Sequence, residues 1–454
     1  MKPNHLLRRL TAGLAALLVL ALPFVTGCED GSLNEPQVQN DLFTSYVSLG
    51  NSITAGFQAN GISSTTQQES YAVQLADQMG TSFSIPELRA PGCPPPVQNI
   101  LTGARPSGTT GETCNLRSRP LPLSVNNVAV PGAKVIDALS NDDEASSANA
   151  LTQFLLGGRT QVNAAADADP TFASVWLGNN DVLGAAIAGN TDLITPQETF
   201  EAQYTNVLDS LEAAGAEGGV LASVTNVTFV PQLITGDAFA AAENQINQFG
   251  QSTAAQNPEA TWGSFSVNSN CISGDPSSAV RASFQYAFSG LFAIALTGQD
   301  VELDCEDNRP LGAIYSNLPL EQIGVSDAVA AQSILTPAET GQVVSAVEGY
   351  NNFIQDQADN RGWAYVDVNN ALGALYAAGT DTPQDPSDDL VPKFPQLNSV
   401  TEAGVSTFGR FFSEDGVHPT GDTHEVVTNL FIAAINQEYG TSLEPIEAPD
   451  VPTP

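Results

Sequence analysis

Basic side chains are scarce in this sequence. Its 454 residues include 14 Lys and Arg against 50 Asp and Glu, which gives a formal net charge of −36 at pH 7. Because binding to nucleic acids requires clustered Lys and Arg, this imbalance argues against a nucleic-acid partner. It also argues against electrostatic adhesion to anionic membranes. The apolar fraction of 42% is still high enough for a folded core rather than a disordered chain.

A long apolar run is missing as well. The run from Leu10 to Phe24 is shorter than the roughly 20 residues that a membrane-spanning helix needs. Positive charges precede it, and a small residue, Gly27, and then Cys28 follow it, which is the order of a secretory signal. This ending resembles the lipobox of bacterial lipoproteins. The resemblance implies a signal peptide at 1–27 and a diacylated Cys28, whereas an ordinary signal peptide with an incidental cysteine is the alternative.

The lipobox resemblance also implies a location. The protein would be exported and anchored by its lipid to the cell envelope, on the periplasmic or surface side of an outer membrane, since two or three acyl chains anchor a protein stably. Residues 28–42 are mostly polar and are expected to form a flexible tether.

Cysteine is rare, with five in the chain. The four besides Cys28 are an even number in an exported protein, which indicates two disulfides. Local pairing, Cys93 with Cys114 and Cys271 with Cys305, is the expected connectivity among three that the sequence permits. No Cys or His spacing is typical of a zinc site.

Five short apolar runs rich in β-branched or aromatic residues are typical of strands buried on both faces of a parallel sheet. They are Ser45–Leu49, Asn127–Val130, Phe172–Leu177, Val220–Thr225 and Ala364–Val368. Apolar residues at helical spacing fall between these runs, and the last such pattern begins near Val427. Alternating strands and helices predict an α/β layered sandwich with a parallel sheet, over residues 43–440.

Two stretches, 84–125 and 230–340, are too long to be simple connections and are expected to be insertions. The second contains an apolar segment, from Phe284 to Ala295, that has the spacing of one helical face. A helix packed on the main body is the favoured interpretation, and a lid or a wall of an acyl pocket is the alternative. Residues 441–454 form an acidic, proline-rich tail that is expected to be disordered.

Ser52 follows the first predicted strand directly, in Gly50-Asn51-Ser52-Ile53. The carboxyl edge of a parallel sheet is where α/β proteins place their ligands. A nucleophilic serine is therefore one interpretation of Ser52, and the N-cap of a helix is the other.

A nucleophilic serine needs a base, and histidine is the scarcest candidate, with three in the chain. His418 lies three residues after Asp415, with Gly416 between them, so a tight turn can bring the carboxylate to the imidazole. His424 has no such partner nearby and is expected to be a solvated residue in the first turn of the last helix.

Ester hydrolysis also needs donors for a developing oxyanion. Gly132 follows the second predicted strand, and the side-chain amide of Asn180 follows the third. Taken singly, each of these motifs is as typical of an ordinary turn as of an active site.

Together these motifs resemble the blocks of the SGNH/GDSL hydrolases, in the same order along the chain. The resemblance implies a flavodoxin-like three-layer α/β/α sandwich and a serine esterase, lipase or acetylesterase without metal or cofactor. It implies Ser52, Asp415 and His418 as the catalytic triad, and Ser52, Gly132 and Asn180 as the oxyanion hole. One departure is Asn51, where the family usually has Asp; an isosteric amide can still brace the turn.

Other functions remain open at this point. A non-catalytic surface lipoprotein could bind a ligand or partner through residues 230–340, and a carboxylate-pair glycosidase would need two acids that composition does not single out. Gly103–Thr110 has the glycine spacing of a phosphate loop but lacks its lysine. We expect a monomer that acts on a small-molecule or lipid ester, and the acidity favours neutral esters in a high-salt environment.

Overall fold

The computed structural model describes residues 38–114, 124–141, 152, 155–274, 279–306, 334–378, 391–400 and 405–451. The chain divides into two units, Met1–Val38 and Gln39–Pro454, and the second contains the fold described below. The predicted signal peptide, Cys28 and the tether up to residue 37 lie outside the described residues.

Four parallel strands form the central sheet, in the order β1-β2-β3-β9. They are β1 (Tyr46–Gly50), β2 (Phe172–Trp176), β3 (Gly218–Ala222) and β9 (Ala364–Val366). Every residue of β1, β2 and β3 is buried, which explains why these strands are mostly apolar, without a regular alternation of polar and apolar residues. Four of the five predicted strands are therefore confirmed, each with at least one end displaced by one to three residues.

The fifth predicted strand, Asn127–Val130, lies beside β1 without forming a regular strand. The Ser48 N–H donates to the Asn126 carbonyl over 2.8 Å, and the Val128 N–H donates to the Ser48 carbonyl over 3.0 Å. With this segment included, the chain crosses the sheet in the order 2-1-3-4-5, which is the flavodoxin-like order.

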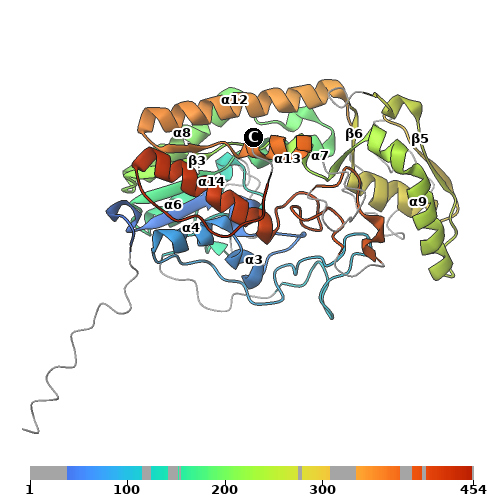
Figure 1. The fold of residues 1–454 in the computed structure, drawn as a ribbon, viewed down its shortest axis with the longest axis horizontal. Helices are drawn as coiled ribbons and strands as arrows, with labels where there is room; N and C mark the ends of the chain where they lie inside the picture. Colours follow the sequence, from blue (N-terminus) through green and yellow to red (C-terminus); the bar gives the residue numbers. More distant parts are fainter. Residues whose placement is uncertain are drawn as a thin grey trace, which may run out of the picture. The chain divides into compact units, whose positions relative to one another are not determined.

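Helices cover both faces of the sheet, so the fold has three layers (Figure 1). Tyr46 and Trp176 point to the face covered by α4 (Tyr71–Met79) and α14 (Gly421–Tyr439). Val47 and Val175 point to the opposite face, which is covered by α6, α8 and α12. Their bounds are Gln161–Ala166, Gln197–Ala213 and Pro337–Arg361. The predicted α/β/α sandwich is confirmed.

Shorter elements join these layers. The α-helices among them are α2 (Ser52–Ala55), α3 (Ser64–Gln68), α7 (Asn179–Ala188) and α13 (Val368–Ala378). The 3-10 helices are η2 (Asp41–Phe43), η3 (Val135–Ala138), η4 (Thr191–Leu193), η5 (Val227–Phe229), η6 (Ser269–Cys271) and η12 (Leu397–Val400).

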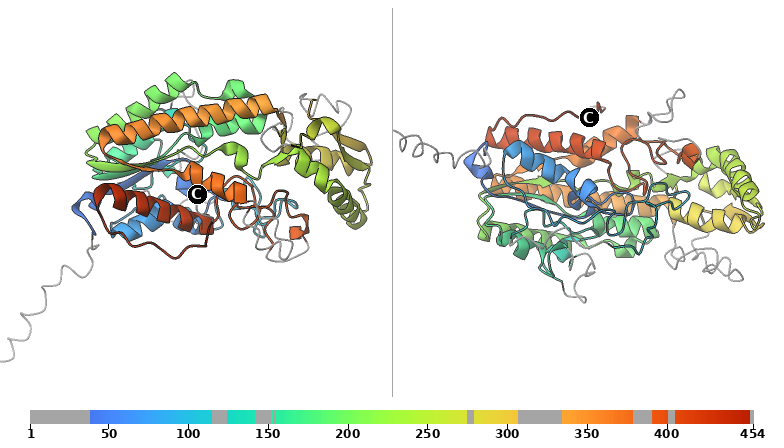
Figure 2. Two further views of the ribbon diagram at one scale, coloured as in Figure 1. Left: turned by 45° about the horizontal axis from the view of Figure 1, so that its top comes forward. Right: turned by 90° about the horizontal axis from the view of Figure 1, so that it is seen from below.

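The insertion at 230–340 contains two small sheets and a long helix, gathered at one end of the domain (Figure 2). Its antiparallel sheet comprises β4 (Leu233–Thr235), β6 (Arg281–Ser283) and β8 (Ile334–Leu335), and its parallel pair comprises β5 (Ser264–Val267) and β7 (Asp300–Leu303). The helix α9 spans Gly236–Gln256.

The apolar segment in this insertion is helical, as predicted, but it begins as a π-helix, η8 (Gln285–Leu291), and continues as α10 (Phe292–Ala295). Phe284, Leu291 and Ala295 are buried. Phe284 also packs edge-on against Phe408, with 5.2 Å between ring centroids. This packing favours a helix that belongs to the body of the domain.

Two disulfides join Cys93 to Cys114 and Cys271 to Cys305, the pairing expected from the sequence. Among the described residues of the first insertion, 84–114 and 124–125, there is no helix or strand, so the disulfide there constrains an irregular segment. None of the helices in the described ranges combines the length and the apolar character needed to cross a membrane.

Both ends of the described chain are more ordered than predicted. The Gln39 N–H donates to the Met79 carbonyl over 3.0 Å, so the packed chain begins before the predicted end of the tether. In the C-terminal tail, Leu443 is buried, and the Ile446 N–H donates to Asn429 of α14 over 2.9 Å. The predicted disorder of the tail is wrong for these residues, because side-chain amides of α14 satisfy the tail's backbone.

Candidate active site

Ser52 is the first residue of α2, directly after β1 turns at the edge of the sheet. Asn51 caps this helix, because its Oδ1 accepts the Ile53 N–H over 3.1 Å. The capping role considered for Ser52 therefore belongs to Asn51. A Cβ at Gly50 would lie 2.1 Å from Thr54 Oγ1, so the tight turn that presents Ser52 requires glycine there.

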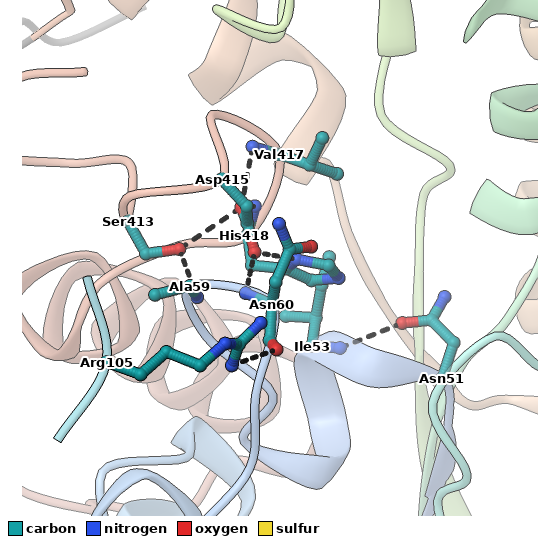
Figure 3. Close-up of polar contacts among 9 residues, drawn as sticks. All are labelled: Asn51, Ile53, Ala59, Asn60, Arg105, Ser413, Asp415, Val417 and His418. Atoms are coloured by element: carbon teal, nitrogen blue, oxygen red, sulfur yellow. Dashed lines mark hydrogen bonds and ion pairs between the residues drawn. The ribbon is translucent and has the colours of Figure 1, made fainter. Parts of the chain in front are cut away.

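Asp415 and His418 are hydrogen-bonded, with 2.7 Å between Asp415 Oδ2 and His418 Nδ1 (Figure 3). The turn between them is held by Asp415 itself, whose Oδ1 accepts the N–H groups of Val417 and His418, each over 2.9 Å. The Phe57 ring lies edge-on to the imidazole, with 4.9 Å between centroids. The carboxylate thus fixes both the position of the imidazole and its tautomer, with the proton on Nδ1.

A tight turn next to the Ser52 helix also holds Asp415. Gln58 and Gly61 exchange backbone hydrogen bonds around Ala59 and Asn60, which both have φ of 51°. The Asn60 N–H donates to Asp415 Oδ2 over 2.7 Å. The Ala59 N–H donates to Ser413 Oγ over 2.8 Å, and this hydroxyl lies 3.2 Å from Asp415 Oδ1 (Figure 3). We refer to Gln58–Gly61 as the clasp turn.

The hydrogen bonds to Asp415 stabilise its charge. Burial by itself would raise the pKa of this carboxyl, but the charge of His418, its ring hydrogen bond and the backbone N–H donors lower the pKa to about 2. Asp415 is therefore ionised at neutral pH even though only 5% of the residue is exposed.

Asn180 lies in the first turn of α7, which follows β2. Its Nδ2 donates to the Ala133 carbonyl over 2.9 Å, and this bond orients the amide and joins α7 to the turn that contains Gly132. Gly132 has φ of 82°, a conformation that glycine adopts at no steric cost. Gly178, before α7, has φ of 115°, and a Cβ there would lie 2.5 Å from Val224.

Most of the predicted site residues lie at a small cavity of about 30 Å³. Ser52, Asn180 and His418 line it, and Asp415 lies behind His418. Gly132 is not among the lining residues, although the adjacent Ala133 contacts Asn180. Such a cavity has room for about one water molecule.

The other residues that line the cavity were not predicted as site residues, although Asn51 and Ile53 belong to the motif around Ser52. They are Asn51, Ile53, Asn179, Leu183, Thr225, Val227, Val230 and Val417. The clasp turn is likewise absent from the prediction; the dipeptide Asn60-Gly61 was its one available signal, since it is typical of tight turns.

His424 lies apart from this cavity, and its predicted exposure is wrong. The residue is fully buried, and its Nδ1 accepts the Tyr71 N–H over 3.3 Å. Burial, followed by the charge of His418, lowers its pKa to about 3, so the ring is neutral. Within the described parts of the chain, no three His, Cys, Asp or Glu side chains are grouped so that they could hold a metal ion.

Comparisons with solved structures find distant likenesses. They include an extracellular lipase from Streptomyces rimosus (14% identity, TM-score 0.34, 86% of this chain and 99% of that one). They also include a mutant acetyl-xylooligosaccharide esterase from Geobacillus (10% identity, TM-score 0.31, 86% of this chain and 93% of that one). A putative GDSL-like lipase from Parabacteroides merdae is 10% identical, with a TM-score of 0.30 and coverage of 86% and 95%. No curated protein matches this chain.

A family model gives the firmer comparison. The model of the GDSL-like lipase/acylhydrolase family matches residues 46–275, which is just over half of the chain and includes Ser52, Gly132 and Asn180. The chain therefore belongs to the GDSL-like lipase/acylhydrolase family.

Proposed function

We propose that this protein is a serine-dependent carboxylic ester hydrolase, with Ser52 as nucleophile, His418 as base and Asp415 as the acid that orients the base. One observation carries the proposal: Ser52 and His418 line the same cavity, and the buried, ionised Asp415 is hydrogen-bonded to His418. Membership of the family supports ester hydrolysis as the reaction class.

The proposed reaction begins when Ser52 Oγ attacks the ester carbonyl and His418 Nε2 accepts the hydroxyl proton. The Ser52 and Gly132 N–H groups and Asn180 Nδ2 stabilise the oxyanion that forms. When the tetrahedral intermediate collapses, the C–O bond to the alcohol breaks, and His418 gives the proton to the leaving oxygen. His418 then deprotonates a water molecule, which attacks the acyl-enzyme, and the proton returns to Ser52 as the free acid leaves.

Asp415 has a supporting part in these steps. It accepts the Nδ1 proton of His418 in a hydrogen bond, and its charge stabilises the imidazolium that forms each time Nε2 takes up a proton. Because the pKa of Asp415 is about 2, the carboxylate stays ionised through the cycle.

Replacing the nucleophile is the direct test. In Ser52→Ala, hydrolysis of p-nitrophenyl butyrate should fall by at least three orders of magnitude, and a fluorophosphonate probe should no longer label the protein. Ser210→Ala is a matched control and should leave both readouts unchanged, because the one partner of this hydroxyl among the described residues is the Asn206 carbonyl of its own helix. Full activity in Ser52→Ala would refute the assignment. An unlabelled, inactive wild type would favour the ligand-binding surface protein instead.

We also propose that the protein is exported and anchored through a lipid on Cys28. The two disulfides support an oxidising location, and the residues before Cys28 support processing as a lipoprotein. When cells are grown with labelled palmitate, the wild-type protein should incorporate the label and the Cys28→Ser variant should not. The purified variant should keep its esterase activity. Equal labelling of the two proteins would contradict the anchor.

A further inference from the structure

A second and much larger cavity, of about 1060 Å³, lies where the insertion meets the main body of the domain. Its walls come from β4, α9, β6, α13 and residues 391–396, and they are largely apolar, including Leu233, Tyr376 and Phe394. This volume is at the upper end of the range for small-molecule sites. No step of the mechanism above uses this cavity.

Arg281 of β6 is a charged residue in the wall of this cavity, and only 4% of it is exposed. Its Nη1 and Nη2 each donate to the Tyr376 hydroxyl over 3.3 Å, Nη1 also lies 3.5 Å from the Leu233 carbonyl, and Nε has no partner. Within the described part of the chain, no carboxylate lies at ion-pair distance from the guanidinium.

An unpaired cation at this depth is costly. Burying a guanidinium without a counter-ion is unfavourable in folding, because its charge loses much of its hydration. The Tyr376 ring, 5.7 Å from the guanidinium carbon, offsets part of this cost. Asp237 lines the same cavity, but its carboxylate accepts hydrogen bonds from Ser273 and Gly274.

The large cavity adjoins the reaction cavity. Val230 lines both of them, with Val227 on the side of Ser52 and Phe229 on the side of Arg281. The two cavities therefore share a wall at Val230, and a substrate with its ester carbon at Ser52 would have to pass this side chain to reach the large cavity. The planar guanidinium fork matches carboxylate and phosphate oxygens.

We propose that Arg281 and the large cavity bind the anionic end of an ester substrate, so that the enzyme prefers esters with a carboxylate- or phosphate-type group separated from the scissile bond by an apolar spacer. This proposal rests on the proposed ester hydrolysis. It revises the expectation of neutral substrates, because the net charge acts at long range, whereas Arg281 acts on a group already inside the cavity.

The test compares two series of p-nitrophenyl esters on the full protein. One series consists of hemiesters of dicarboxylic acids from succinyl to sebacyl, and the other of neutral alkanoyl esters of equal length. The wild type should show a higher kcat/KM for the hemiester at one or more spacer lengths. Arg281→Gln should lower that preference about 10- to 100-fold and leave the neutral esters nearly unchanged.

Two further variants separate binding from folding. Arg281→Lys keeps the charge without the fork and should restore part of the preference. Arg281→Met removes the buried charge and should unfold at the same temperature as the wild type or higher. Thermal stabilisation of Ser52→Ala by sebacate should disappear in the double variant Ser52→Ala/Arg281→Met.

The outcomes are distinguishable. Equal kcat/KM for hemiesters and neutral esters at every length would overturn the anion site and leave ester hydrolysis intact. A proportional loss on both series in Arg281→Gln, with a lower unfolding temperature in Arg281→Met, would make Arg281 a structural residue. Inactivity of the wild type on both series would instead refute the proposed function, while the sebacate measurement would still test the site.

Discussion

Among single residues, Asp415 has the most connected side chain of the site. Three backbone N–H groups, the Ser413 hydroxyl and the His418 ring surround its two oxygens. Every one of these contacts favours an acceptor with negative charge. The residue therefore differs from a surface acid, whose oxygens exchange freely with water.

Asp415→Asn is predicted to lower kcat about three to four orders of magnitude with a small change in KM, because the amide cannot hold the imidazole in the same tautomer. One of its atoms becomes a donor facing other donors, so the variant should also lose about 1–3 kcal/mol of stability. Steady-state kinetics and urea unfolding measure the two effects. Asp209→Asn changes an exposed acid paired with Arg361 and should alter neither. An Asp415→Asn protein with wild-type kcat would contradict the orienting role.

At the residue scale, the sequence predicts contacts between near neighbours in the chain but not contacts between distant ones. Asp415 and His418 are three residues apart, so a local pattern predicted their contact. The clasp turn is not local: Asn60 and Asp415 are 355 residues apart, and the positive φ of Ala59 cannot be inferred from an alanine. Only the folded sheet brings the two segments together.

At the scale of elements, two buried titratable groups fix helices to their neighbours. The ring of His424 on α14 accepts the Tyr71 N–H, which begins α4 and has no acceptor within its own helix. Asp181 on α7 accepts the Thr195 hydroxyl over 2.8 Å and the Val135 N–H over 3.1 Å. Burial is the main cause of both pKa shifts: it lowers the pKa of His424 to about 3 and raises the pKa of Asp181 to about 6.

These two shifts predict opposite pH dependences of stability. The unfolded chain protonates His424 below the ordinary histidine pKa of 6.5 while the folded protein does not, so this residue's contribution is lost as the pH falls from about 6.5 to 3. Asp181 takes up its proton at a higher pH when folded, so its contribution is present below about pH 4 and is lost as the pH rises through 6.

Urea unfolding between pH 4 and 6.5 tests the pair. Relative to the wild type, His424→Gln should lose less stability as the pH falls, while Asp181→Asn should lose more; each difference should be on the order of 2 kcal/mol. Equal pH profiles for the two variants would contradict the buried, shifted groups. The helices α4 and α14 were predictable from their apolar spacing. The burial of His424 was not, because His424 accepts the Tyr71 N–H of another helix, a contact that no local pattern encodes.

At the scale of the whole molecule, the excess of acid dominates. With 50 acidic and 14 basic residues, most carboxylates have no cation to pair with. Their mutual repulsion is weakened by salt, since the screening length shrinks from about 10 Å at 0.1 M to about 3 Å at 1 M.

We therefore predict that the unfolding temperature rises steadily from 0.05 M to 2 M KCl at pH 7. At pH 4, close to the calculated isoelectric point of 4.1, the same salt series should produce a much smaller rise, because the net charge is then small. Differential scanning calorimetry at the two pH values makes the comparison. A rise of equal size at both would point to salting-out of apolar surface rather than charge screening.

The overall architecture could be predicted from the alternation of apolar strands and helical patterns, and the net charge could be read from the composition. The large cavity could not be predicted from the sequence. Arg281 and Tyr376 lie on different elements, β6 and α13, and their contact depends on how an insertion closes against the main sheet. No periodicity in either segment encodes that arrangement.

The clasp turn can meet the Asp415 loop only after both segments have been synthesised, so the proposed site is incomplete until residue 415 has been added. The ribosome adds the proposed nucleophile, Ser52, long before the proposed acid and base, Asp415 and His418, so a chain that is still being synthesised has Ser52 without its partners. With the proposed triad, the unfinished chain cannot hydrolyse esters of the cell that makes it. A truncated product that ends before Asp415 should lack esterase activity for the same reason.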